Sequence, residues 1–163
     1  LPLEEMVAIV DATLEAGHPV AWGTDVSEKG FNGGKAIGVV PESVEKNLIG
    51  SDAEKWGKLS EAEKRAKINN LEGPMKEMTI TQEMRQEAFD NYQSTDDHGM
   101  VIVGTAEDQA GNPFFKVQNS WGESGPYKGF YYFSLPFFEY KTMDIMVHKS
   151  MVPKEIMKKI GLK

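Results

Sequence analysis

The chain has 163 residues, of which 40% are hydrophobic and 26% are charged, and its 25 acidic against 18 basic residues give a formal net charge of −7. This length and composition suit one globular domain with a real core, so we treat residues 1–163 as a single domain. The acidic balance argues against nucleic acid or an anionic membrane surface as a partner. Apolar runs stay far below the roughly 20 residues of a membrane span. The absence of cysteine excludes disulfides and cysteine-ligated metal centres.

The N-terminal residues predict a helix followed by a strand. Apolar side chains recur every three or four positions from Leu3 to Leu14, which is the spacing of an amphipathic helix, and Gly17 and Pro19 mark its end. We expect His18, just beyond that end, to act as a helix cap rather than as a metal ligand. Residues 19–24 are predicted to form a short buried strand, and the glycine-rich residues 30–35 a turn.

Residues 40–95 are predicted to form a mainly helical segment within the domain. Ser51 and Ser60 each stand three residues before a glutamate, which fits the capping box of a helix start. Residues 52–63 also match part of a calcium-binding loop, but Trp56 occupies a position that needs an oxygen ligand. We therefore predict no metal site there.

A further helix is predicted after Thr81, beyond the Gly73-Pro74 break. Its spacing places four apolar or aromatic side chains on one face: Met84, Ala88, Phe89 and Tyr92.

The pattern becomes strand-like after His98. Residues 99–105, 114–119 and 129–134 are rich in β-branched and aromatic side chains and are separated by glycine and proline, which is typical of an antiparallel meander. A last strand near residues 143–148 and a short helix at 153–160 complete the chain. Helices followed by strands predict the α+β class.

The first two of these strands bring two polar side chains together. If they form a hairpin centred on the Asp108-Gln109 turn, His98 lies directly opposite Asn119, and four apolar residues share one face: Met100, Ile102, Phe115 and Val117. An asparagine oxygen can accept a hydrogen bond from an imidazole N–H and so orient a general base. A satisfied polar pair without catalytic function explains the same spacing.

Two short motifs resemble a known family. Residues 118–122 read Gln-Asn-Ser-Trp-Gly, which resembles the Asn-Ser-Trp-Gly signature of papain-like cysteine peptidases, and Asp97-His98-Gly99 resembles the histidine segment of that family. Residues 17–26, 84–89, 128–130 and 152–153 resemble the C-terminal half of the bleomycin hydrolase and aminopeptidase C branch. The resemblance implies a papain-like α+β fold in which the antiparallel sheet, or half-barrel, carries the histidine and the asparagine.

The resemblance also implies residue roles. His98 would be the catalytic base, Asn119 would orient its ring, and Trp121 would shield their hydrogen bond from water. Asp97, beside His98, is expected to support the site by favouring the imidazolium form, although a solvated turn explains the same carboxylate. No cofactor and no metal ion are implied.

The chain departs from the family in one important respect, because the nucleophile of papain-like peptidases is a cysteine and this sequence has none. Either the chain is the C-terminal part of a longer thiol peptidase, which the start at Leu1 favours, or it is a pseudo-peptidase that acts as a binding or scaffolding module. In the first case the chain alone should be inactive.

In that first case the expected partners are a peptide substrate, the cysteine-bearing N-terminal part of the same protein and further copies of the chain. The resemblance implies a cytoplasmic location. Aminopeptidase and endopeptidase action both stay open, because the tail after Val152-Pro153 could lie extended in a cleft or form a helix.

Overall fold

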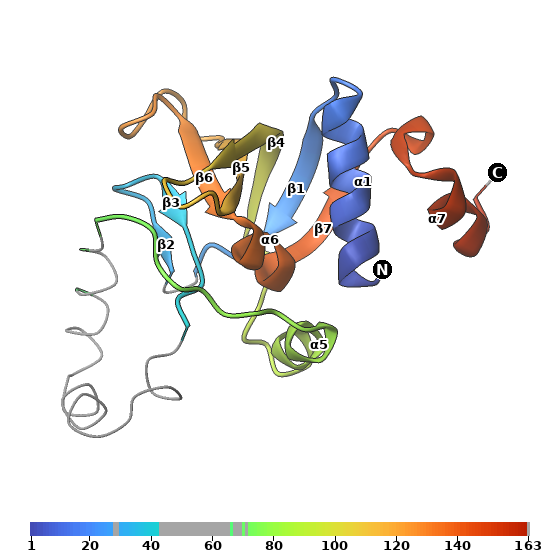
Figure 1. Ribbon diagram of the computed structural model, residues 1–163, viewed down its shortest axis with the longest axis horizontal. Helices are drawn as coiled ribbons and strands as arrows, with labels where there is room; N and C mark the ends of the chain where they lie inside the picture. The colour runs from blue at the N-terminus through green and yellow to red at the C-terminus, as the bar shows by residue number, and fades with distance from the viewer. Residues whose placement is uncertain (28–29, 43–65, 67–69, 71, 163) are drawn as a thin grey trace.

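The computed structural model describes residues 1–27, 30–42, 66, 70 and 72–162. Its strands form one curled sheet, against which the helices α1 (Leu3–Glu15) and α6 (Leu135–Lys141) pack (Figure 1). The order across the sheet is β2-β3-β6-β5-β4-β1-β7, and all neighbours are antiparallel except β3 and β6. The strands are β1 (Val20–Thr24), β2 (Phe31–Asn32), β3 (Ile37–Gly38), β4 (His98–Glu107), β5 (Pro113–Gln118), β6 (Phe130–Ser134) and β7 (Thr142–Met146).

The helices lie at the start of the chain, before β4 and around β7. They are α1 (Leu3–Glu15), α5 (Gln82–Asp90), α6 (Leu135–Lys141), the 3-10 turn η1 (Lys149–Met151) and α7 (Lys154–Lys159). In Figure 1, α1 runs beside β1 and β7, and α7 lies beyond α1 at the C-terminal end. Among the described residues, no helix combines the length and the apolar character that crossing a membrane requires.

Helix α1 confirms the predicted amphipathic helix. Its residues Leu3, Met6 and Val10 are buried in the main core. Gly17 has a φ of +80° and donates its N–H to the Leu14 carbonyl at 2.9 Å, so the helix ends at the position where a glycine is needed. The backbone N–H of His18 closes the same end by donating to the Thr13 carbonyl at 3.0 Å.

Aromatic side chains fill the core between the sheet and α6. Trp22 is 2% exposed and meets Phe133 edge-on at a centroid distance of 4.9 Å. Phe137 and Phe138 of α6 are fully buried against them. Helix α6 was not predicted from the sequence: its N-cap is Ser134, whose side chain accepts the Phe137 N–H at 3.2 Å.

The predicted meander of β4, β5 and β6 is confirmed, but the predicted register is wrong. Val101 pairs with Gln118, and after a bulge near Val103 Thr105 pairs with Phe115. The β4–β5 loop therefore centres on Ala110 rather than on Asp108-Gln109. Within this loop, Asp108 accepts the Ala110 and Asn112 N–H groups. On the His98 side of the bulge the slip from the predicted register is two residues, which keeps each side chain there on its predicted face. The four residues predicted to share an apolar face are all buried in the main core: Met100, Ile102, Phe115 and Val117.

The predicted helix after Thr81 forms, and the Thr81 side chain caps it by accepting the Met84 N–H at 3.2 Å. The predicted apolar face is only partly correct: Ala88 is buried, but Phe89 is 56% exposed and Tyr92, beyond the helix end, is 84% exposed. Helical spacing cannot tell which aromatic side chains a neighbouring element will cover.

Within the 40–95 segment, residues 43–65, 67–69 and 71 lie outside the described residues, and so do the two capping boxes and the partial calcium-loop match. Before Thr81 the described residues 72–80 are not helical; Glu77 forms an isolated antiparallel bridge with Pro41. The predicted turn at 30–35 contains the two residues of β2, and its tight part is residues 33–36.

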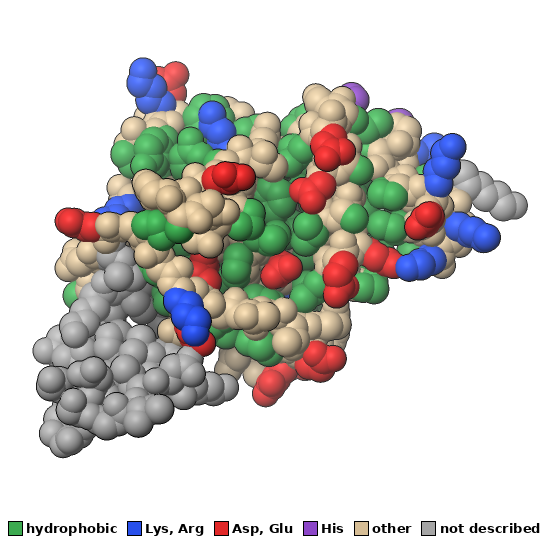
Figure 2. All heavy atoms as spheres, viewed as in Figure 1, with side chains coloured by type: hydrophobic (Ala, Val, Ile, Leu, Met, Phe, Trp, Pro, Cys, Tyr) green, Lys and Arg blue, Asp and Glu red, His purple; other side chains and the backbone are tan. Residues whose placement is uncertain are grey.

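Figure 2 shows the charge distribution on one face. Acidic side chains are scattered over this face, and basic side chains gather at the end where α7 lies. Helix α7 carries three lysines, of which Lys159 pairs with Glu5 of α1 at 2.5 Å. Lys159 thereby ties the C-terminal helix to α1.

Candidate active site

His98 is the first residue of β4, and neighbouring strands fix its backbone. It pairs with Thr24 in the register between β1 and β4. Its side chain is half-buried and lines an open hollow of about 680 Å³ at this end of the sheet, together with Gly23, Asn119 and Asp144. The imidazole therefore stands at the edge of the core, where a ligand can reach it.

Asn119 follows the last residue of β5 and is 5% exposed. Its backbone N–H donates to the Gly129 carbonyl at 2.9 Å, which closes the loop between β5 and β6. Gly129 has a φ of +87°, and a Cβ there would lie 2.2 Å from the Gly122 carbonyl oxygen, so only glycine fits. No role for Gly129 was predicted from the sequence, although its place between the Asn-Ser-Trp-Gly motif and a strand was a usable signal.

The two side chains meet in a hydrogen bond of 2.8 Å between His98 Nε2 and Asn119 Oδ1. The sequence predicted this pair from direct opposition of the two residues. The observed register instead makes them diagonal neighbours, because a two-residue slip retains the face and changes only the offset.

A second hydrogen bond assigns the protons. Asn119 Oδ1 also accepts the backbone N–H of Ser120 at 2.7 Å, so the amide oxygen must point this way. A carbonyl oxygen has no proton to donate, and His98 Nε2 must therefore be the donor. In the neutral ring the lone pair is then on Nδ1, which is the nitrogen able to take up a proton.

Trp121 lies against the imidazole, with ring centroids 4.8 Å apart and an interplanar angle of 44°. Its other ring contacts are Phe31 at 6.2 Å and Tyr131 at 6.0 Å. The indole is 48% exposed, whereas Asn119 beneath the loop is nearly inaccessible. This geometry suits a cover over the imidazole and amide.

The Asp97 carboxylate binds the loop that follows β1, and its predicted support of the imidazolium form stays a prediction. Its carboxylate accepts the Val26 N–H at 2.8 Å and the Ser27 N–H at 3.2 Å, and it also accepts the Ser27 hydroxyl. Burial raises the pKa of Asp97, but the hydrogen bonds from Ser27 and Val26 outweigh that effect and hold the pKa below its usual value. Its observed contribution is to tie the residue before His98 to the loop after β1.

The other histidines lie apart from the pair. His18 is exposed at the end of α1, and His148 caps η1 through Ser150. In the part of the chain that the structure describes, no three His, Asp or Glu side chains converge as a metal site would require.

Comparison with known proteins supports a peptidase family. The family model described as "Peptidase C1-like family" matches residues 45–162, which is most of the chain. Aminopeptidase G of Lactobacillus delbrueckii subsp. lactis is 36% identical over 58 residues, covering 36% of this chain and 13% of the relative. Aminopeptidase C of Lactobacillus helveticus is 28% identical over 74 residues, covering 45% of this chain and 16% of the relative.

A solved structure shows the same fold. The crystal structure of PepW from Lactobacillus rhamnosis HN001 superposes with a TM-score of 0.62 at 23% sequence identity, covering 99% of this chain and 30% of that one. The chain thus spans less than a third of the solved relative. Its α+β architecture with a half-barrel sheet is the papain-like fold, and the chain belongs to the Peptidase C1-like family, in the aminopeptidase C branch of the papain-like cysteine peptidases.

Proposed function

We propose that this chain supplies the general base of a thiol peptidase: His98 as the base, Asn119 as the residue that orients it and Trp121 as the cover of their hydrogen bond. The observation that carries the proposal is the 2.8 Å bond from His98 Nε2 to an amide oxygen whose orientation Ser120 fixes. That bond holds the ring in one tautomer and leaves Nδ1 as the basic nitrogen.

The proposed chemistry needs a thiol from outside this sequence, which has no cysteine. His98 Nδ1 takes the thiol proton, and the thiolate attacks the carbonyl carbon of a peptide bond. The resulting imidazolium then gives that proton to the leaving amine as the carbon–nitrogen bond breaks. Water, deprotonated by the neutral imidazole, hydrolyses the thioester and releases the acid. The short alignments with longer aminopeptidases support a cysteine-bearing segment elsewhere in a longer polypeptide.

The proposed substrates are peptides, and removal of amino-terminal residues is the favoured reaction. The names of the relatives, aminopeptidases G and C, support this preference. A substrate with a free amine and a matched one with a blocked amine would distinguish aminopeptidase from endopeptidase action.

The test compares two proteins on amino-acid amides. The first is the 163-residue chain, and the second is the same chain expressed with the coding sequence that precedes Leu1. We expect activity only in the second, with complete loss after iodoacetamide treatment and loss of nearly all activity after His98→Ala substitution.

Three results would contradict the peptidase proposal: activity in the isolated chain, activity that resists iodoacetamide, or a preceding segment without cysteine. The last result would favour the binding or scaffolding module that the sequence left as the alternative.

A further inference from the structure

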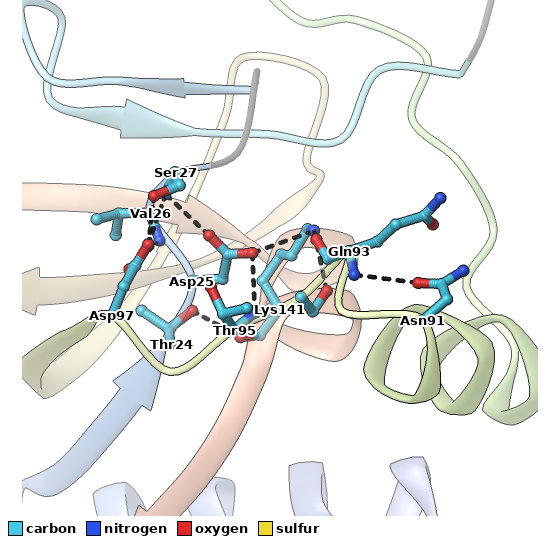
Figure 3. A network of polar contacts seen from close by, with 10 residues as sticks. Thr24, Asp25, Val26, Ser27, Asn91, Gln93, Thr95, Asp97 and Lys141 are labelled. Atoms are coloured by element: carbon cyan, nitrogen blue, oxygen red, sulfur yellow. Dashed lines mark hydrogen bonds and ion pairs between the residues drawn. The ribbon is translucent and has the colours of Figure 1, made fainter.

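A buried ion pair lies one loop away from the candidate active site. Lys141 Nζ, at the end of α6, is 3.6 Å from Asp25 Oδ2, just after β1, and the two side chains are 1% and 5% exposed. Removing two charges from water costs several kcal/mol each unless hydrogen bonds replace the lost hydration. Figure 3 shows the hydrogen bonds that replace the lost hydration of this ion pair.

The ammonium group holds the segment that leads into His98. Lys141 Nζ donates to the Gln93 carbonyl at 3.1 Å and to the Ser94 hydroxyl at 2.9 Å. Gln93 in turn donates its N–H to Asn91 Oδ1 at 3.0 Å, which shapes the turn after α5. The side chain of one buried lysine therefore anchors the connection between α5 and β4.

The carboxylate holds the same connection from its other side. Asp25 Oδ2 accepts the Thr95 N–H at 3.2 Å, and Asp25 Oδ1 accepts the Ser27 N–H at 2.8 Å. Asp97, which lies before β4, connects the two loops in the opposite direction, since it accepts the Val26 and Ser27 N–H groups from the loop after β1. Two aspartates thus bind each other's loops.

Hydrogen bonds connect this network to the backbone of His98. The Asp97 N–H donates to the Thr24 carbonyl at 3.3 Å, and Thr24 pairs directly with His98. The Thr24 hydroxyl donates to the Lys141 carbonyl at 2.9 Å, which returns the chain of contacts to the lysine. The backbone before His98 and its strand partner are therefore attached to the same residue.

Stability alone does not explain the pair. Burial raises the pKa of Asp25 even though Lys141 and the Thr95 N–H oppose that effect. At neutral pH the ionised carboxylate therefore makes the fold less stable than a protonated carboxyl group would. Well-packed apolar residues in place of a buried ion pair often stabilise a protein. What apolar side chains cannot do is bind the backbone and hydroxyl groups of residues 93–95.

We propose that Lys141 and Asp25 are positioning residues for His98, holding residues 93–97 so that the imidazole meets Asn119 Oδ1. The importance of this positioning for catalysis rests on the proposed function. The geometric effect itself is measurable in the chain without any activity.

The test reads the imidazole of His98 directly by ¹⁵N NMR in the 163-residue chain. The wild type should show a protonated Nε2 with a slowly exchanging proton. Lys141→Met should increase the exchange rate of that proton at least about tenfold and mix the tautomers, because local opening before β4 releases the ring. Lys141→Arg, which retains the charge and its donors, should restore most of the wild-type signal, and Ser94→Ala should give a smaller increase.

The control separates positioning from general destabilisation. Ile156→Ala removes a buried side chain of a separate apolar cluster, so it should lower the melting temperature without changing the His98 signals. If Lys141→Met does not fold, the uncharged double variant Asp25→Asn with Lys141→Met replaces it.

The outcomes are decisive in either form of the experiment. Unchanged His98 exchange and tautomer in the folded variant would overturn the proposal. Faster exchange of the Nε2 proton with mixed tautomers, alongside unchanged His98 signals in Ile156→Ala, would support it. A longer, thiol-bearing protein that is inactive while its His98 signals are normal would count against the proposed function and leave this inference intact.

Discussion

Asn119 fixes which imidazole nitrogen of His98 carries the proton. Its oxygen is committed to the Ser120 N–H and to His98 Nε2, so the ring cannot turn over without losing a hydrogen bond. The residue types were evident from the sequence motif, but the proton assignment was not, because it depends on the backbone N–H of Ser120.

Asn119→Ala should therefore impair the proposed reaction less than His98→Ala does. We expect a decrease in kcat of about 10- to 100-fold for Asn119→Ala, against about 1,000-fold or more for His98→Ala, since only the latter removes the base. The measurement is steady-state kinetics on the thiol-bearing protein. Equal losses in two well-folded variants would refute the orienting role.

Asp97 should stabilise the fold at neutral pH and make it sensitive to acid. Because the folded-state pKa of Asp97 lies below the usual aspartate value of about 3.9, its contribution to stability is present above that pH and is lost as the pH falls through the lowered value. Asp97→Asn should accordingly destabilise the chain at pH 6 and flatten the loss of stability below pH about 4. Melting temperatures across this range test the sign, and a variant that is as acid-sensitive as the wild type would show the assignment to be wrong.

At the scale of elements, local pattern predicted the strands and their faces well. Local pattern could not predict the β4–β5 register. The Asp108 turn and the bulge near Val103 determine which residues pair, and neither changes the alternation of apolar residues along the strands. Helix α6 was missed because its aromatic residues continue the strand-like run of β6, and only Ser134 followed by Pro136 indicates a helix start.

The N-caps of α5 and α6, Thr81 and Ser134, can be compared by matched substitutions. Thr81→Ala should cost about 1 kcal/mol of unfolding free energy, the usual value of a lost N-cap. Ser134→Ala should cost about 2 kcal/mol or more, because Ser134 also donates to Glu77 Oε2 at 2.6 Å and this second hydrogen bond, to a half-buried carboxyl group, is lost together with the cap. Urea unfolding gives both values, and a smaller loss for Ser134→Ala would contradict the second contribution.

For the molecule as a whole, the curled sheet brings the end of β5 and the start of β4 to one rim. The sequence predicted the α+β class and the histidine and asparagine that meet there. It gave no sign of the Lys141–Asp25 pair, because residues distant in the chain become neighbours only when α6 returns against β1. Long-range polar contacts of this kind carry no periodic signal.

Close packing of the curled sheet should make Gly38 intolerant of a side chain. A Cβ there would lie 2.3 Å from Phe133 Cδ1 and 3.3 Å from Phe137 Cδ2, whereas a Cβ at Gly104 meets nothing within 4 Å. Gly38→Ala should therefore cost about 1–3 kcal/mol or more of stability, and Gly104→Ala should be close to neutral. Thermal unfolding of the two variants compares them, and equal melting temperatures would mean that the sheet is less tightly packed than described.

The central claim is that His98 is the base partner of a thiol, and the pH dependence of thiol alkylation tests it most directly. In the longer, thiol-bearing protein, a neighbouring imidazolium stabilises the thiolate, so iodoacetamide should react rapidly well below the ordinary cysteine pKa of about 8.5. In His98→Ala the rate should instead rise only as the pH approaches that value. Identical pH profiles for the wild type and His98→Ala would contradict the account.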